Sequence, residues 1–135
     1  MARAFLVVSS LFIVCILVQV FLAGLGVFER AGAFLTHRDF GYAFGWLALV
    51  MLVLALVGHF PRRQVVLVLA IILAFALQSV FVGLRSAAPT VAALHPLNGA
   101  LILLLAIEVT RYAWAYRRFE HLPGTAPDRT SQLDA

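Results

Sequence analysis

The chain has 135 residues and a formal net charge of +4, and 64% of its residues are hydrophobic while only 12% are charged. Soluble domains are nearer half apolar and a quarter charged, so this composition predicts one integral membrane domain and excludes a water-soluble one. All ten basic residues are arginines in predicted loops, helix ends and the tail, so we interpret the charge as a topology signal and not as a nucleic-acid-binding surface. The single cysteine, Cys15, excludes an internal disulfide and redox chemistry by a thiol pair.

Four apolar segments predict an all-α, four-helix membrane bundle, with helices over about residues 5–28, 37–58, 65–84 and 90–116. Each has close to the ~20 apolar residues that span a bilayer. The second helix is expected to start at His37, because Thr36 and Asp39 have the spacing of a capping box. Pro96 falls in the first turns of the last helix, where proline is tolerated. Residues 59–64 are predicted to form a basic turn, and the bundle domain is expected to cover residues 1–118, before a disordered cytoplasmic tail over 119–135.

Two stretches of the sequence repeat one another. Each has the pattern Gln-x4-Gly-Leu, a short polar loop and His-x3-Gly. The repeated positions are Gln19, Gly24, His37 and Gly41 in the first stretch, and Gln78, Gly83, His95 and Gly99 in the second. An internal repeat of this kind predicts two equivalent helix pairs.

The arginine distribution predicts how the helices are oriented. The Arg62–Arg63 turn and the arginine-rich end of the last helix lie on one side, and the loops opposite carry fewer uncompensated arginines. The positive-inside rule then predicts a multi-pass membrane protein with both termini in the cytoplasm. The two helix pairs start on the same side, so they are expected to be parallel repeats about an axis along the membrane normal. This arrangement brings His37 and His95 to one depth near the outer face, facing each other.

Two facing histidines in a four-helix bundle predict a haem site. His37 and His95 would supply both axial ligands of the iron of haem b. The repeat glycines are expected near one level, where they would leave room for the flat macrocycle; they are Gly24, Gly41, Gly83 and Gly99. Zinc is a poorer candidate, because its sites need three or four ligands and no cysteine or carboxylate repeats with the histidines.

Four polar residues complete the predicted site. Arg38 and Arg85 at the outer rim would pair with the haem propionates. Gln19 and Gln78, deeper in the bundle, would donate hydrogen bonds or line a small polar cavity. Each residue also has a simpler interpretation: histidines and arginines at the membrane interface, glutamines that join helices, and glycines that permit tight helix packing.

Four further residues have interpretations of their own: Glu108, Arg111, His59 and Gly45. An ion pair is expected between Glu108 and Arg111, which are three residues apart near the cytoplasmic interface. His59 is predicted to lie at that interface too. Gly41 and Gly45 share a helix face with His37, and this small-residue spacing predicts the close approach of something flat or of another backbone.

Three fragments resemble one half of haem A synthase, over about residues 15–105: LVQVFLAGLG, LQSVFVGLR and VAALHPLNGALI. That family has two fused four-helix bundles, and the resemblance implies that His37 and His95 are the axial ligands of a haem b on the outer side. The family has a glutamate just before its first histidine, whereas Leu35 and Thr36 precede His37 here and Glu29 is eight residues away. Haem A synthesis is therefore not implied. The chain also resembles an uncharacterised family of small four-helix bacterial membrane proteins with the same His-x3-Gly pattern, which implies no activity.

These features predict a membrane b-type cytochrome for electron transport or haem handling, because two histidine ligands leave the iron no open position. One haem near one face calls for a partner besides membrane lipid: a quinone, a redox protein, a second copy in a homodimer, or a larger membrane complex. The alternative is a cofactor-free accessory subunit of a respiratory or photosynthetic membrane complex. A third hypothesis is an enzyme half-site in which one histidine leaves the iron, with Glu29 and Asp39 as the only nearby acids.

Overall fold

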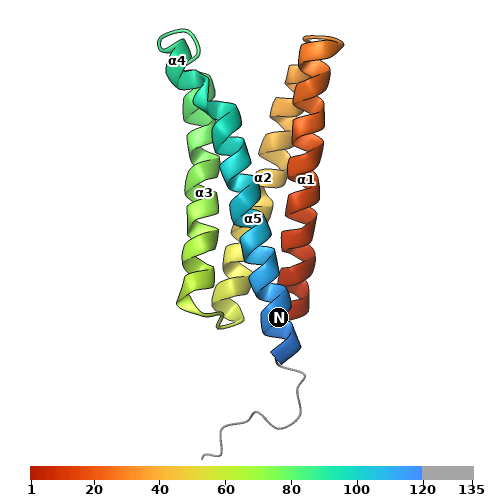
Figure 1. Cartoon of the computed structure of the whole chain (residues 1–135), viewed down its shortest axis with the longest axis vertical. Helices are drawn as coiled ribbons and strands as arrows, with labels where there is room; N and C mark the ends of the chain where they lie inside the picture. Colours follow the sequence, from red (N-terminus) through yellow and green to blue (C-terminus); the bar gives the residue numbers. More distant parts are fainter. Residues whose placement is uncertain (120–135) are drawn as a thin grey trace, which may run out of the picture.

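The computed structural model describes residues 1–119, and within them every regular element is a helix. The helices are α1 (Ala2–Phe28), α2 (Ala33–Val57), α3 (Arg62–Gly83), the short α4 (Pro89–Ala92) and α5 (Leu94–Phe119) (Figure 1). Within residues 1–119, four segments are long and apolar enough to cross a membrane: α1, α2, α3 and the span Pro89–Tyr116. The predicted all-α membrane bundle is confirmed, and the chain is a multi-pass membrane protein. The predicted tail lies outside the described residues, apart from Phe119.

The helices form a ring of four neighbours. α1 packs on α2 and α3 packs on α5, and the two pairs meet through α1 against α5 and α2 against α3. Consequently α2 and α5 lie on one diagonal of the bundle, and α1 and α3 lie on the other. Both pairs run in the same direction (Figure 1), so the predicted parallel repeat is confirmed.

Aromatic side chains fill the middle and one end of the bundle. In the middle, the Phe44 ring lies 5.4 Å from Phe12 and 5.3 Å from Phe75, measured between ring centroids. A Cβ added to Gly45 would lie 2.7 Å from the Phe75 ring, so the predicted close approach is confirmed at this glycine. Near the α2–α3 turn (residues 58–61), the Phe60 ring contacts Phe5 and Tyr116, with centroids 4.8 Å and 5.4 Å away. We call this end the closed end.

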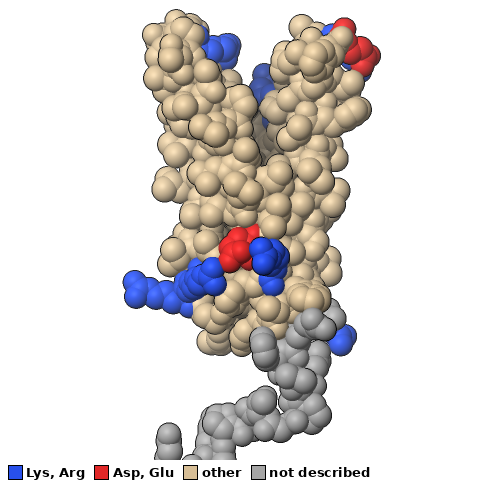
Figure 2. Space-filling model, in the orientation of Figure 1, with Lys and Arg blue, Asp and Glu red and all other residues tan. Residues whose placement is uncertain are grey.

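The opposite end is open. It carries the α1–α2 connection (residues 29–32) and α4, and the two helix pairs diverge toward it (Figure 1). The space-filling view shows a notch between the pairs, with basic side chains beside it (Figure 2). The repeat histidines lie in the half of the bundle that opens in this way.

Three helices begin earlier than predicted: α1 at Ala2, α2 at Ala33 and α3 at Arg62. α2 begins at Ala33 after Gly32, without a side-chain cap, so the expected capping box of Thr36 and Asp39 is wrong. The connection before α2 is already wound into turns, because the backbone N–H groups of residues 33–35 donate to the carbonyls three residues earlier. No side-chain acceptor is therefore needed at Thr36.

The last predicted helix is divided. Pro89 occupies the first turn of α4, and a turn at Ala93 separates α4 from α5. α5 starts at Leu94, which places Pro96 in its first turn. The first turn is where a missing backbone N–H removes no helical hydrogen bond.

Candidate functional site: a histidine pair across the bundle

His37 lies in the second turn of α2 and is half-buried. Its Nδ1 is 3.0 Å from the backbone carbonyl oxygen of Gln19 on α1. A carbonyl only accepts hydrogen bonds, so the hydrogen-bonded tautomer of His37 carries its proton on Nδ1. Nε2 then keeps its lone pair, which is the form of histidine that binds metals.

His95 repeats this arrangement on the other helix pair. It is half-buried in the first turn of α5, and its Nδ1 is 3.4 Å from the backbone carbonyl oxygen of Gln78 on α3. The contact is longer than that of His37, but the partner is the equivalent glutamine carbonyl. The sequence repeat therefore corresponds to a repeated contact.

The two histidine rings lie opposite each other. Their centroids are 6.1 Å apart and their planes make an angle of 65°. His37 comes from α2 and His95 from α5, which occupy one diagonal, so the rings meet across the middle of the bundle and not along one of its seams.

The glutamine side chains explain two of the four repeat glycines. A Cβ added to Gly41 would lie 2.6 Å from Nε2 of Gln19, and one added to Gly99 would lie 3.3 Å from Nε2 of Gln78. These distances are tighter than ordinary van der Waals contacts. Gly41 and Gly99 thus make room for amide groups of their own helix pairs.

The other two repeat glycines border open space. A Cβ added to Gly24 or Gly83 would meet no atom within 4 Å. Each lies five residues beyond its glutamine, which is about 7.5 Å further toward the open end at 1.5 Å per residue. The expectation that all four glycines lie near one level is therefore wrong: Gly41 and Gly99 contact the glutamines, and Gly24 and Gly83 lie nearer the open end.

Asn98 belongs to this region and was missed in the sequence. It is buried, and its Nδ2 donates to the backbone carbonyl of Ala74 at 2.7 Å and to Oε1 of Gln78 at 2.8 Å. In the first repeat Phe40 holds the equivalent position, and Oε1 of Gln19 is buried without a hydrogen-bond partner among the described residues. The available signal was a polar residue inside an apolar helix, one position before a repeat glycine.

The predicted rim arginines differ in their partners. Arg38 is exposed and forms an ion pair with Asp39, with 2.8 Å between Nη2 and Oδ1. Arg85 is exposed in the connection between α3 and α4 and forms no ion pair with any residue from 1 to 119. Of the two predicted rim arginines, Arg85 is thus the one that has no acidic partner among residues 1–119.

A second polar cluster lies toward the closed end. Glu108 is bound by Arg63 of α3, with 2.7 Å between Oε1 and Nη2, so the expected pair with Arg111 is wrong. The Arg63 guanidinium also lies 5.6 Å from the Tyr112 ring centroid. Gln64 was placed in the turn by the sequence but is buried in α3, where Nε2 donates to the Val109 carbonyl at 2.9 Å. These contacts fix α3 to α5.

Among residues 1–119, no three side chains of His, Cys, Asp or Glu come together as a metal-binding group. The histidine pair supplies two nitrogen ligands. Such a pair suits a metal that brings its remaining ligands with it, as the iron of haem does.

Comparisons with known proteins identify a family that matches part of the chain. A family described as a family of unknown function (DUF6220) matches residues 19–88, from Gln19 of the first repeat to a point after Gly83 of the second. No curated protein and no solved structure matches. The comparisons show no relationship to haem A synthase, so that resemblance stays a prediction from the sequence fragments.

Proposed function

The chain belongs to the DUF6220 family of unknown function, and we propose that it is a membrane b-type cytochrome that holds one haem b between His37 and His95. The observation that carries the proposal is the separation of the two rings. A metal–nitrogen bond is about 2.0–2.1 Å long, and the ring centroid lies ~1.1 Å beyond the nitrogen. Two imidazoles that bind one metal from opposite sides would therefore have centroids about 6.3 Å apart. The rings of His37 and His95 are 6.1 Å apart. The angle between the planes does not conflict, because rotation about each metal–nitrogen axis leaves this distance unchanged.

The hydrogen bonds to the histidines support the same function. Metal-binding histidines usually donate their second ring N–H to a carbonyl or carboxylate, which fixes the ring orientation and raises the basicity of the metal-binding nitrogen. The Gln19 and Gln78 carbonyls are in place to do this for His37 and His95. More basic axial ligands stabilise oxidised iron, so we expect these bonds to lower the reduction potential.

The open space also fits the group. With the histidines on one diagonal, the other diagonal is that of α1 and α3, which carry Gly24 and Gly83. The space beside both glycines is free, and the notch of Figure 2 leads into the same half of the bundle. Arg85 is the better candidate for a propionate partner, because Arg38 is already paired with Asp39.

Haem supplies reversible one-electron chemistry when it is bound. His37 and His95 would hold the iron of such a haem from both sides, and this favours electron transfer or haem handling over oxygen chemistry. We further propose that the chain lies in the bacterial inner membrane with cytoplasmic termini, which places the histidine pair near the outer face. A quinone, a redox protein or a second copy of the chain would then exchange electrons with the haem from that face.

The alternative function, a cofactor-free subunit that packs on a larger complex through its glycine faces, has less support. Gly41, Gly45 and Gly99 face side chains of their own bundle, so their missing Cβ atoms are explained without a partner. The enzyme half-site has less support as well, because one of its two candidate acids, Asp39, is paired with Arg38.

The test is the absorption spectrum of the detergent-purified full chain, oxidised and then reduced with dithionite, before and after addition of haemin. We expect a low-spin b-type spectrum that is lost in His37→Ala and in His95→Ala. His59→Asn is the matched control: His59 is exposed at the closed end, and asparagine tolerates its backbone φ of 51°. A wild-type protein that stays colourless with haemin would refute the proposal, as would equal loss in the His59 variant. Circular dichroism of each variant checks that the helices are retained.

A further inference from the structure

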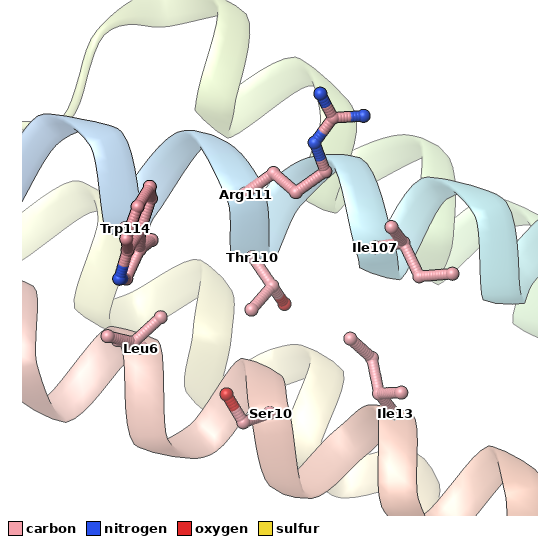
Figure 3. Close-up of a pocket in the computed structure, with 7 residues that line it drawn as sticks. All are labelled: Leu6, Ser10, Ile13, Ile107, Thr110, Arg111 and Trp114. Carbon is pink, nitrogen blue, oxygen red and sulfur yellow. The ribbon is translucent and has the colours of Figure 1, made fainter.

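We propose that the groove between α1 and α5 near the closed end binds an anionic phospholipid. The α1–α5 groove has a volume of about 430 Å³ and is shown in Figure 3. Leu6, Ser10 and Ile13 of α1 form one wall, and Ile107 and Thr110 of α5 form the other. The site lies in the other half of the molecule from the histidine pair and does not depend on haem.

The side chains that line the groove differ from one end of it to the other. Leu6 and Trp114 lie together at one end, and Ile13 and Ile107 lie at the other (Figure 3). Ser10 and Thr110 lie between these two ends, on opposite walls (Figure 3). One end is therefore suited to the membrane interface, where tryptophan is enriched, and the other is purely aliphatic.

Arg111 lines the groove at its rim, and its guanidinium extends from α5 away from the α1 wall (Figure 3). In the proposed site this rim lies at the depth of the lipid head groups. Glu108 lies one turn before Arg111 and forms an ion pair with Arg63. Arg63 lies at the start of α3, at the end of the bundle where the basic residues are. The Ile107 end lies four residues further into the membrane, or about 6 Å. A head group beside Arg111 would therefore place an acyl chain along the isoleucines.

The charge at the rim is not balanced within the described part of the chain. Arg111 also lines a neighbouring hollow with Glu108, but the Glu108 carboxylate is bound to Arg63 at 2.7 Å. Arg111 forms no ion pair with any residue from 1 to 119, and Figure 2 shows basic side chains on both sides of the acidic group. A phosphate is the complement of such a site, because guanidinium groups bind phosphate by charge-assisted hydrogen bonds.

The hydroxyl groups of Ser10 and Thr110 indicate which part of the ligand would lie in the middle of the groove. The Thr110 hydroxyl donates a hydrogen bond to the Ala106 carbonyl at 2.8 Å. Ser10 is exposed, and its hydroxyl has no hydrogen-bond partner among residues 1–119. A free hydroxyl facing hydrocarbon is unfavourable, so Ser10 is suited to donate to an ester carbonyl. Phosphate, ester and acyl chain in this order describe a phospholipid, and the uncompensated arginine selects an anionic one.

Native mass spectrometry of the detergent-purified full chain tests the site by titration with phosphatidylglycerol and with phosphatidylcholine of the same acyl chains. We expect phosphatidylglycerol to bind about five-fold more tightly, the contribution of one basic residue near an anionic lipid surface. Arg111→Gln should abolish this preference, and Arg111→Lys should keep most of it. Arg62→Gln is the matched control, because Arg62 is an exposed arginine of the same end that does not line the groove.

Two further measurements separate the sources of binding. Ser10→Phe, which fills the groove, should weaken the binding of both lipids. Glycerol phosphate, which has the anion without the chains, should not compete at concentrations equal to those of the lipid. The proposal is wrong if Arg111→Gln keeps the preference, if Arg62→Gln loses it to the same extent, or if glycerol phosphate displaces the lipid.

Discussion

The two repeat glutamines are equivalent in the sequence but not in the structure, so replacing them should have opposite effects on stability. Oε1 of Gln78 accepts a hydrogen bond from Asn98 at 2.8 Å, whereas Oε1 of Gln19 is buried and has no hydrogen-bond partner within the described part of the chain. Methionine is the appropriate substitute, because it matches glutamine in length and lacks the amide.

The expected magnitudes follow from these contacts. Gln78→Met removes one hydrogen bond between helices, and such bonds in membrane proteins are worth about 0.6 kcal/mol on average and ~1.7 kcal/mol at most. We therefore expect a loss of about 1 kcal/mol. Gln19→Met removes a buried acceptor that makes no hydrogen bond, and an unsatisfied buried group costs about 1–3 kcal/mol. Its removal should leave the free energy of unfolding unchanged or raise it by about 1 kcal/mol. The two variants should thus differ by about 1–2 kcal/mol.

The assay is reversible unfolding of the haem-free full chain in mixed micelles with increasing sodium dodecyl sulfate, followed by far-ultraviolet circular dichroism. Asn98→Leu provides the second side of a double-mutant cycle, whose coupling energy with Gln78→Met isolates the hydrogen bond. Equal destabilisation by Gln19→Met and Gln78→Met would refute the reasoning, because it would mean that the Gln19 amide has a partner of similar strength.

Two other predictions concern packing and charge. Gly45→Ala should destabilise the bundle by about 1–3 kcal/mol, because its Cβ would lie 2.7 Å from the Phe75 ring in a packed aromatic cluster; Gly24→Ala, with free space around it, should not destabilise the haem-free protein in the same micelle unfolding experiment. The ion pair of Arg63 and Glu108 should contribute less than about 1 kcal/mol in a double-mutant cycle, because its side chains are 62% and 40% exposed. A coupling energy of several kcal/mol would contradict this value.

The number and order of the helices could be predicted because membrane spans must be long, apolar and helical. The pairing of His37 with His95 could be predicted because the repeat fixes two equivalent positions, and equivalent helices of a parallel repeat face each other across its axis. Neither inference needs the details of side-chain packing.

Contacts between side chains of distant segments were less predictable. Glu108 had an acceptable partner three residues away in Arg111, but Arg63, 45 residues earlier in the sequence, is the partner in the folded bundle. The start of α3 packs beside α5, and this neighbour is not visible in a local sequence pattern. Asn98 was missed for a related reason, since its two acceptors lie on another helix.

The equivalence of the two helix pairs has a consequence for the origin of the protein. A helix hairpin that dimerised about a two-fold axis would place two copies of one histidine opposite each other, so a single ancestral hairpin is enough to create the pair. Every other position near the axis would then also be occupied by identical residues. Gene duplication and fusion remove that constraint, which is what allows Asn98 in one half and Phe40 in the other. The two sides of the histidine pair can therefore evolve separately while the ligands stay the same.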